Sequence, residues 1–172
     1  MSAAALFLSP PDPAAFAPFG QFILPPDTPG QRAFYSGHFH LRPPSSAPVL
    51  HVNHVLASPL PLTVKWLERH PHAEQCFIPL DVSRYVALAV PSDHAGLPVV
   101  DEARGFVVPG TVGVIFHTNV WHLGATVLDR PGNFSVLMWR GGATQDDEFR
   151  AIAPLTLDEA ASDAPAPREL SR

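Results

Sequence analysis

The stretch 62-LTVKWLERHPHAEQCFIPL-80 carries the pattern that decides the fold. An alternating segment ends in polar residues, a short Pro-His-Ala turn follows, and an apolar run begins at Gln75. Short runs of this kind predict two strands joined by a turn. Because alternate residues of a strand share one face, Glu68 and His70 are expected to point to the same side, with Gln75 facing them from the next strand. His72 is then expected in the turn, exposed to solvent.

Similar short runs recur along the chain, each bounded by Pro, Gly, Asn or Asp. They predict strands at residues 21–24, 33–41, 49–56, 62–68, 75–79, 85–91, 106–108, 112–117, 124–128 and 134–140. Helical pattern is confined to a turn after Asp12 and another at 98–104. So many short strands predict an all-β sandwich or barrel with a few short peripheral helices. We expect a single domain over residues 1–157 and a flexible C-terminal tail over 158–172, where apolar periodicity is absent.

Composition narrows the class of partner. The chain has 172 residues, a net charge of −5 and no basic run, which argues against nucleic acid and against an anionic membrane surface. A small molecule or a protein is the expected partner. The one cysteine, Cys76, excludes an internal disulfide and is typical of a reducing compartment. The N-terminal apolar stretch is short and has no preceding positive charge, so we expect neither a signal peptide nor a membrane span and place the protein in the cytoplasm.

A second histidine-bearing segment reads 109-PGTVGVIFHTNVWHLG-124. A Pro-Gly turn precedes an apolar strand, and His117 and His122 flank a short Thr-Asn-Val-Trp turn. Together the two segments resemble the cupin family, whose first motif is His-x-His, three or four residues and then Glu, and whose second is a Pro-Gly turn followed by a lone His. Matching by spacing puts Glu68, His70 and Gln75 in the first motif and His122 in the second. The resemblance implies a cupin-type double-stranded β-helix barrel, jelly-roll-like in form.

A narrower resemblance covers most of the chain. The segments LFLSPPDPAAFAPFGQFI, LTVKWLERHPHAEQCFIPL, HTNVWH and WRGG are similar to the ureidoglycolate lyase family of allantoin and purine catabolism. The family implies an enzyme that cleaves the C–N bond of ureidoglycolate to glyoxylate and urea. The segment PGQRAFYSGHFHLRPP and the Leu123-Gly124 pair depart from the family pattern. A cupin that acts on or senses a different small 2-hydroxy or 2-oxo acid, or a metal-dependent cupin oxygenase or isomerase, therefore stays as an alternative.

The implied chemistry needs a base for the substrate hydroxyl and an acid for the departing urea nitrogen. Glu68, His70 and His122 are the predicted catalytic residues, since histidine titrates near neutrality. The predicted substrate-binding residues, which would hold a small carboxylate, are Gln75, Asn119, Arg140 and His40. Asn119 is equally suited to closing the turn before His122. Arg69 is out of phase with the site and is expected at the surface or at a subunit interface.

The cofactor is left open. Glu68, His70, Gln75 and His122 form a candidate metal site, and Ni²⁺, Zn²⁺ or Mn²⁺ are the candidate ions. Catalysis by acid and base alone is an equal alternative. Cupins of this size commonly pair through edge strands, so the resemblance also implies a homodimer.

Overall fold

The computed structural model describes residues 4–42, 44–142 and 146–160. Its elements, in chain order, are β1 (Ala4–Leu8), α1 (Pro13–Phe16), β2 (Gly20–Ile23), η1 (Ser36–His38), β3 (Ala47–Val55), β4 (Leu62–Arg69), β5 (Gln75–Pro79), β6 (Arg84–Val90), η2 (Val100–Glu102), β7 (Arg104–Pro109), β8 (Gly113–Phe116), β9 (Trp121–His122), β10 (Val127–Leu128), β11 (Gly132–Arg140) and β12 (Glu148–Glu159).

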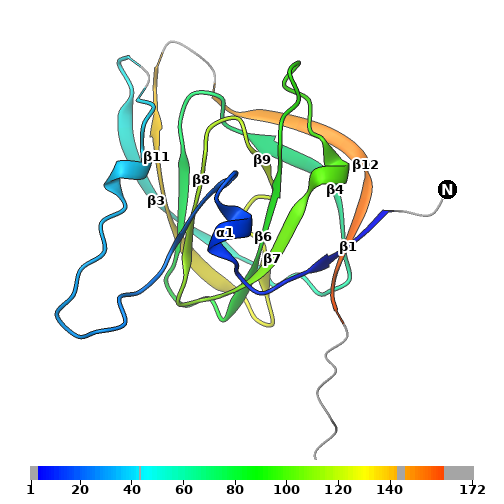
Figure 1. Ribbon diagram of the computed structural model, residues 1–172, viewed down its shortest axis with the longest axis horizontal. Coiled ribbons are helices and arrows are strands. Elements are labelled where there is room, and N and C mark those ends of the chain that lie inside the picture. Colours follow the sequence, from blue (N-terminus) through cyan, green and yellow to red (C-terminus); the bar gives the residue numbers. More distant parts are fainter. Residues whose placement is uncertain (1–3, 43, 143–145, 161–172) are drawn as a thin grey trace, which may run out of the picture.

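The strands form two curled sheets. The larger sheet has the order β1-β12-β4-β9-β6-β10, with β7 also paired to β6, and the smaller has the order β2-β8-β5-β11-β3. Backbone hydrogen bonds from Ser9 to Gly105 and from Val107 to Ser9 join the end of β1 to β7, so the larger sheet curls back on itself. Figure 1 shows the resulting barrel-like sandwich with α1 in front of the strands. The predicted all-β, cupin-type fold is confirmed.

Two hydrophobic cores support this arrangement. The first lies between the sheets and includes Phe77 and Phe134 of the smaller sheet together with Phe106 of the larger. The second draws its buried residues from the strands of the larger sheet and from Ala103, which follows η2. Strand β6 separates the two cores, because its alternate side chains point to opposite sides: Tyr85, Ala87 and Ala89 enter the first core, and Val86, Leu88 and Val90 enter the second.

The helices are single turns, as predicted. Asp12 caps α1, because its Oδ1 accepts hydrogen bonds from the backbone N–H groups of Ala14 and Ala15. The second predicted turn is η2, within residues 98–104. No helix in residues 4–42, 44–142 and 146–160 has the length and apolar character to cross a membrane.

The strand predictions were right for most of the two sheets. They differ from the structure in one segment that is not a strand, one strand that is shorter than predicted, and three strands that were not predicted. Residues 33–41 are not a strand; they hold only η1, and Phe39 packs its ring 5.3 Å from that of Trp139. The predicted strand 124–128 is reduced to β10, and β1, β9 and β12 were not predicted. The β1 and β12 strands pair with each other in parallel from opposite ends of the chain, so neither has a local turn signal.

Strand β12 also moves the predicted start of the tail. It continues to Glu159, so Asp158 and Glu159 belong to the larger sheet and not to a tail. The remainder of the predicted tail, residues 161–172, lies outside the described residues.

Candidate active site

The site lies where β4 and β9 of the larger sheet meet β5 of the smaller one. Glu68 on β4 is directly opposite His122 on β9 in the antiparallel register. The neighbouring Leu67 side chain enters the second core, so Glu68 points the other way, into the space between the sheets. Gln75 opens β5 and reaches the same space, because its Oε1 lies 2.9 Å from His122 Nε2.

His122 is fixed on three sides. Its Nδ1 donates to the carbonyl oxygen of Val120 at 2.9 Å, and its ring stacks on Phe116 with a centroid distance of 4.4 Å. Its Nε2 faces two oxygens, Gln75 Oε1 at 2.9 Å and Glu68 Oε1 at 3.3 Å. The amide nitrogen of Gln75 is turned toward Met138 Sδ, which keeps its oxygen on His122. Each ring nitrogen of His122 therefore faces an oxygen, an arrangement in which both nitrogens can act as donors.

His70 is held from one side only. Its Nδ1 lies 2.9 Å from the carbonyl oxygen of Asp146 and 3.2 Å from Asp147 Oδ1, so Nδ1 carries the proton. Its Nε2 then has a lone pair. That atom is buried and has no hydrogen-bond partner among the described residues. The His70 and His122 ring centroids are 5.4 Å apart, so the two rings are neighbours in the site.

His70 and Glu68 differ in their charge at neutral pH. Burial lowers the pKa of His70 below its ordinary 6.5, and the charge of His122 lowers it further, in spite of the carbonyl of Asp146 and the nearby carboxylates. Burial alone would raise the pKa of Glu68, but the hydrogen bond and charge of His122 outweigh it and bring that pKa below 4.5. At neutral pH the site therefore holds a neutral His70 beside a charged Glu68.

The donor set also suits a divalent ion. Ligand atoms of Glu68, His70 and His122 lie within 4.8 Å of one another, and the unpartnered His70 Nε2 is the kind of atom a metal engages. Both imidazoles are held through Nδ1 by backbone carbonyls, which is how metal-binding histidines are commonly oriented. The fit requires His122 to give up its Nε2 proton, because only a free lone pair coordinates a metal.

Arg140 lies at the edge of the site. It ends β11 in phase with the buried Met138, and its Nε contacts the sulfur of that residue. Its Nη1 pairs with Asp147 Oδ2, and the side chain is 37% exposed. Because a guanidinium has five N–H donors, Arg140 keeps donors for a ligand while bound to Asp147.

Two predicted residues are placed differently. Asn119 is exposed, adopts a left-handed conformation with φ of 65° and donates its backbone N–H to the His70 carbonyl, so it closes the turn that presents His122. The structure does not bring His40 to Glu68, His70 and His122. Its ring is 67% exposed and lies 3.6 Å from the buried carboxylate of Glu74, the residue before β5.

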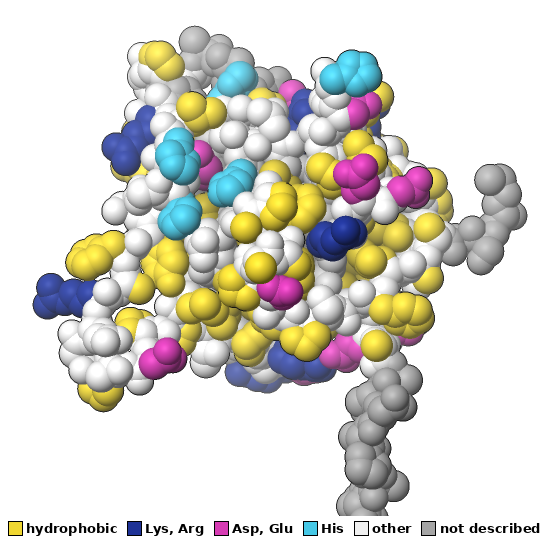
Figure 2. Space-filling model, in the orientation of Figure 1, with side chains coloured by type: hydrophobic (Ala, Val, Ile, Leu, Met, Phe, Trp, Pro, Cys, Tyr) yellow, Lys and Arg dark blue, Asp and Glu magenta, His cyan; other side chains and the backbone are white. Residues whose placement is uncertain are grey.

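His40 belongs instead to a second group of histidines. His38, His40 and the buried Glu74 act electrostatically on His117, whose pKa burial lowers below 6.5. Because Phe116 faces His122, His117 faces away from the site. Histidine side chains gather on the upper left of the face shown in Figure 2.

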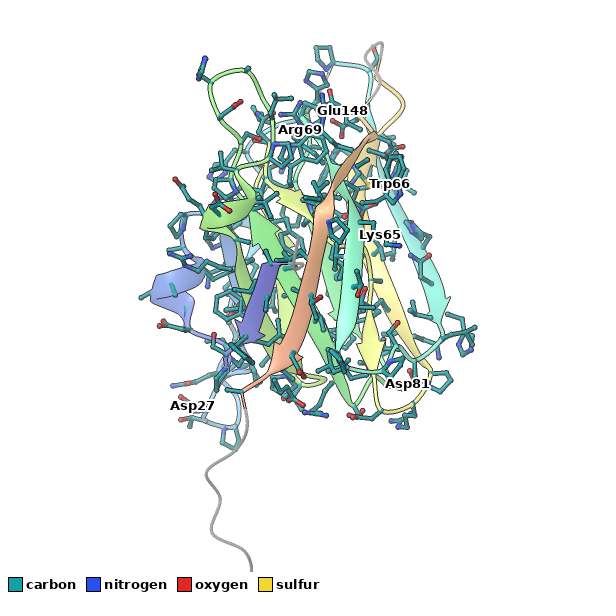
Figure 3. The ribbon with its side chains drawn as sticks, turned by 90° about the vertical axis from the view of Figure 1, so that its right-hand side faces the viewer. Asp27, Lys65, Trp66, Arg69, Asp81 and Glu148 are labelled. Carbon is teal, nitrogen blue, oxygen red and sulfur yellow. The ribbon has the colours of Figure 1, made fainter. Side chains whose placement is uncertain are left out.

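Sequence reasoning missed three acids that follow β11. Asp146 and Asp147 contact His70, and Glu148 pairs with Arg69 at the ends of β12 and β4 (Figure 3). Arg69 was expected at the surface or at a subunit interface; its side chain is only 12% exposed, donates to the Gly96 carbonyl and lies over the Trp121 ring. The run of three acids in QDDEF was the available signal, but nothing local links it to a histidine far away in sequence.

An apolar pocket adjoins the site from inside the barrel. Its lining includes Phe77, Phe116, Leu123 and Gly124. A Cβ placed on Gly124 would lie 3.3 Å from Glu68 Oε1, so the glycine leaves one side of that carboxylate open.

Comparison with known proteins identifies the family of the chain. The family model described as ureidoglycolate lyase matches residues 3–158. A protein named ureidoglycolate lyase from Pseudomonas savastanoi pv. phaseolicola is 31% identical over 166 residues, covering 89% of this chain and 95% of the relative. One of the same name from Azotobacter vinelandii is 31% identical over 154 residues, covering 83% of this chain and 90% of the relative. The chain therefore belongs to the ureidoglycolate lyase family.

Proposed function

We propose that this protein is an enzyme that cleaves the C–N bond of ureidoglycolate and releases urea and glyoxylate. Membership of the family supports the reaction, and its relatives are named for it. The observation that carries the chemistry is the pairing of a neutral His70, with Nε2 open, and a His122 ring that both Glu68 and Gln75 approach. A base and an acid thus lie on the same small site.

His70 is the proposed base. Its Nε2 lone pair accepts the proton of the substrate hydroxyl as that oxygen becomes the carbonyl of glyoxylate. Burial keeps the pKa of His70 below 6.5, so the ring is available in its basic form at neutral pH. A positioned general base of this kind contributes on the order of 10²–10⁴-fold to the rate.

His122 is the proposed acid. Its Nε2 proton passes to the urea nitrogen as the C–N bond breaks, and the electron pair of that bond leaves with the nitrogen. Glu68, 3.3 Å away, stabilises the charged ring before transfer, and Gln75 helps to orient it. Both histidines are restored when His70 loses and His122 regains a proton to and from solvent.

Arg140 is the proposed binding group for the substrate carboxylate. Guanidinium and carboxylate form a paired set of charged hydrogen bonds, and Arg140 retains donors beyond the one given to Asp147. Gly141 follows with φ of 91°, which lets the chain turn away without a side chain at the rim.

Glu68, His70 and His122, with Gln75 beside them, are also the residues that would hold a divalent ion. Such an ion would polarise an oxygen of the substrate as a Lewis acid. The same residues would then orient the substrate rather than transfer its protons.

The direct test is to incubate the purified protein with racemic ureidoglycolate, with and without added Ni²⁺, Zn²⁺ or Mn²⁺, and to follow glyoxylate release. Release well above the spontaneous rate, and its loss in His70→Ala, supports the proposal. Release at the spontaneous rate in every condition contradicts it.

We further propose that two copies pair through β3, and that the enzyme works in purine catabolism in the cytoplasm. Strand β3 is the end strand of the smaller sheet, and it exposes Leu50 and Val52 at 69% and 60%. A long apolar edge strand of this kind is commonly covered by another chain. Light scattering should give a dimer for the wild type and a monomer for Val52→Lys; a monomeric wild type would contradict the pairing.

A further inference from the structure

Three consecutive acids run alongside the first histidine segment. Glu148 pairs with Arg69, to which it is opposed in the β12–β4 register. The next residue toward the N-terminus, Asp147, contacts His70, and Asp146 accepts the backbone N–H of His72 at 2.6 Å. The acids thus continue the pairing of β12 and β4 beyond the strands and along the turn that carries His70.

Asp147 differs from the other two because it links two residues of the site. Its Oδ1 lies 3.2 Å from His70 Nδ1, and its Oδ2 pairs with Arg140 Nη1. The ion pair with Arg140 places a positive charge beside the Asp147 carboxylate. The Asp147 carboxylate therefore contacts both His70, on its Nδ1 side, and Arg140, the residue proposed to bind the substrate.

We propose that Asp147 is a positioning residue, which keeps the Nδ1–H of His70 turned away from the site and its Nε2 turned into it. Arg140 anchors the carboxylate in this role. The inference rests on the proposed function, because it assigns a purpose to the orientation of His70. It adds a residue that neither the cupin motifs nor the sequence pattern indicates.

The physical reason is the choice between two tautomers. A neutral imidazole carries its proton on either nitrogen, and the hydrogen bond made by one nitrogen decides the state of the other. The carbonyl oxygen of Asp146 accepts a hydrogen bond from Nδ1, and the carboxylate of Asp147, 3.2 Å from Nδ1, favours a proton on the same side of the ring. Removing the carboxylate weakens the preference for Nδ1–H and lets Nε2–H, which cannot act as a base, gain population.

The variants are Asp147→Ala and Asp147→Asn. Asparagine keeps an oxygen beside Nδ1, so Asp147→Asn should retain most of the orientation, whereas Asp147→Ala leaves Nδ1 with the Asp146 carbonyl oxygen alone and weakens it. Asp129→Asn is the matched control, since Asp129 also pairs with an arginine, Arg84, but at the opposite end of β6 from His122. Its φ of 65° is one that asparagine tolerates.

The first readout needs no substrate. In protein labelled with ¹⁵N-histidine, the His70 ring should show a protonated Nδ1 and an unprotonated Nε2 in the wild type, in Asp129→Asn and in Asp147→Asn. The Asp147→Ala variant should shift both signals toward the other tautomer. Unchanged His70 signals in a folded Asp147→Ala variant would overturn the proposal, whatever the reaction proves to be.

The second readout is kinetic. Loss of a residue that orients a catalytic group commonly costs about 10–100-fold in activity, so kcat of Asp147→Ala should fall by that range. Asp147→Asn should fall by less, and Asp129→Asn should match the wild type. A kcat for Asp147→Ala within twofold of the wild type would contradict the role even if the protein proves to be a lyase. A protein with no lyase activity but with the tautomer shift would contradict the proposed function and leave the positioning intact.

Discussion

Glu68 and His122 face each other directly across β4 and β9, with Oε1 of the acid 3.3 Å from Nε2 of the imidazole. Cross-strand partners on one face of a sheet are its closest neighbours, so this contact follows from the register. The charge of His122 holds the pKa of Glu68 below 4.5 in spite of burial. Carboxylate and ring therefore act as one unit, and removing either should disable both.

Glu68→Gln and His122→Ala should each lower kcat by about 10²–10⁴-fold, because each removes part of the proposed acid. His72→Ala is the control. The contact that His72 makes to Asp146 uses its backbone N–H, which alanine keeps. Rates of glyoxylate release from ureidoglycolate, with circular dichroism to confirm folding, give the measurement. Equal damage from His72→Ala and His122→Ala would show that the cupin spacing has been matched to the wrong histidine.

The pKa shifts predict how stability depends on pH. The pKa of His70 is lower in the folded protein than its ordinary 6.5. Between pH 6.5 and that lower pKa, His70 is therefore protonated in the unfolded chain but not in the folded protein. Stability should therefore fall as the pH drops from 6.5 toward the folded pKa. Glu68, whose folded pKa lies below 4.5, contributes stability above pH 4.5 that is lost at lower pH.

Urea unfolding midpoints at pH 7.5, 6.5 and 5.5 measure the contribution of His70 to the pH dependence of stability. The wild type should lose stability between 6.5 and 5.5, and His70→Gln should lose less, because glutamine has no proton to bind. His94→Gln provides a comparison at another histidine. Equal losses in the wild type and in His70→Gln would show that His70 does not have the lowered pKa.

The β4–β5 pair could be predicted because its signals are local. Alternation placed Glu68 and Leu67 on opposite faces, and the turn set Gln75 on the facing strand. The partner strand β9 has only two residues, too few for a periodic signal, and only the family resemblance located His122. Asp146 could not be found in this way: it is 76 residues from His70, and the β12–β4 pairing that brings them together leaves no trace in either segment alone.

His40 was predicted to be a site residue, but the structure places it away from Glu68, His70 and His122. A histidine in an aromatic, alternating segment predicted a strand and a pocket position, yet 33–41 folds into η1 and irregular chain. The backbone N–H groups of His40 and Leu41 donate to the buried Glu74 carboxylate. Those hydrogen bonds replace the strand pairing that the propensity of the segment favoured, because tertiary contacts override β-propensity.

Metal binding can be tested without activity. If Glu68, His70 and His122 hold an ion, calorimetric titration with Zn²⁺ or Ni²⁺ should give about one equivalent, with tighter binding at higher pH because protons compete with the metal for its ligands. His70→Ala and His122→Ala should each abolish that equivalent, and His94→Ala should not. Binding that survives in His122→Ala would place the ion elsewhere, with the His38, His40 and His117 group as the first alternative.

Gly124 should prove important for the state of Glu68. An added Cβ would lie 3.3 Å from Glu68 Oε1, closer than a comfortable contact, so Gly124→Ala should push the carboxylate away from His122. Displacement of a catalytic group by a fraction of an ångström to an ångström costs up to about 10²-fold, and we expect a loss of kcat/KM of about tenfold. Gly37→Ala is the control, because a Cβ there meets nothing within 4 Å. Both variants should keep a melting temperature near that of the wild type; an active Gly124→Ala enzyme would show that Glu68 has room to move without losing His122.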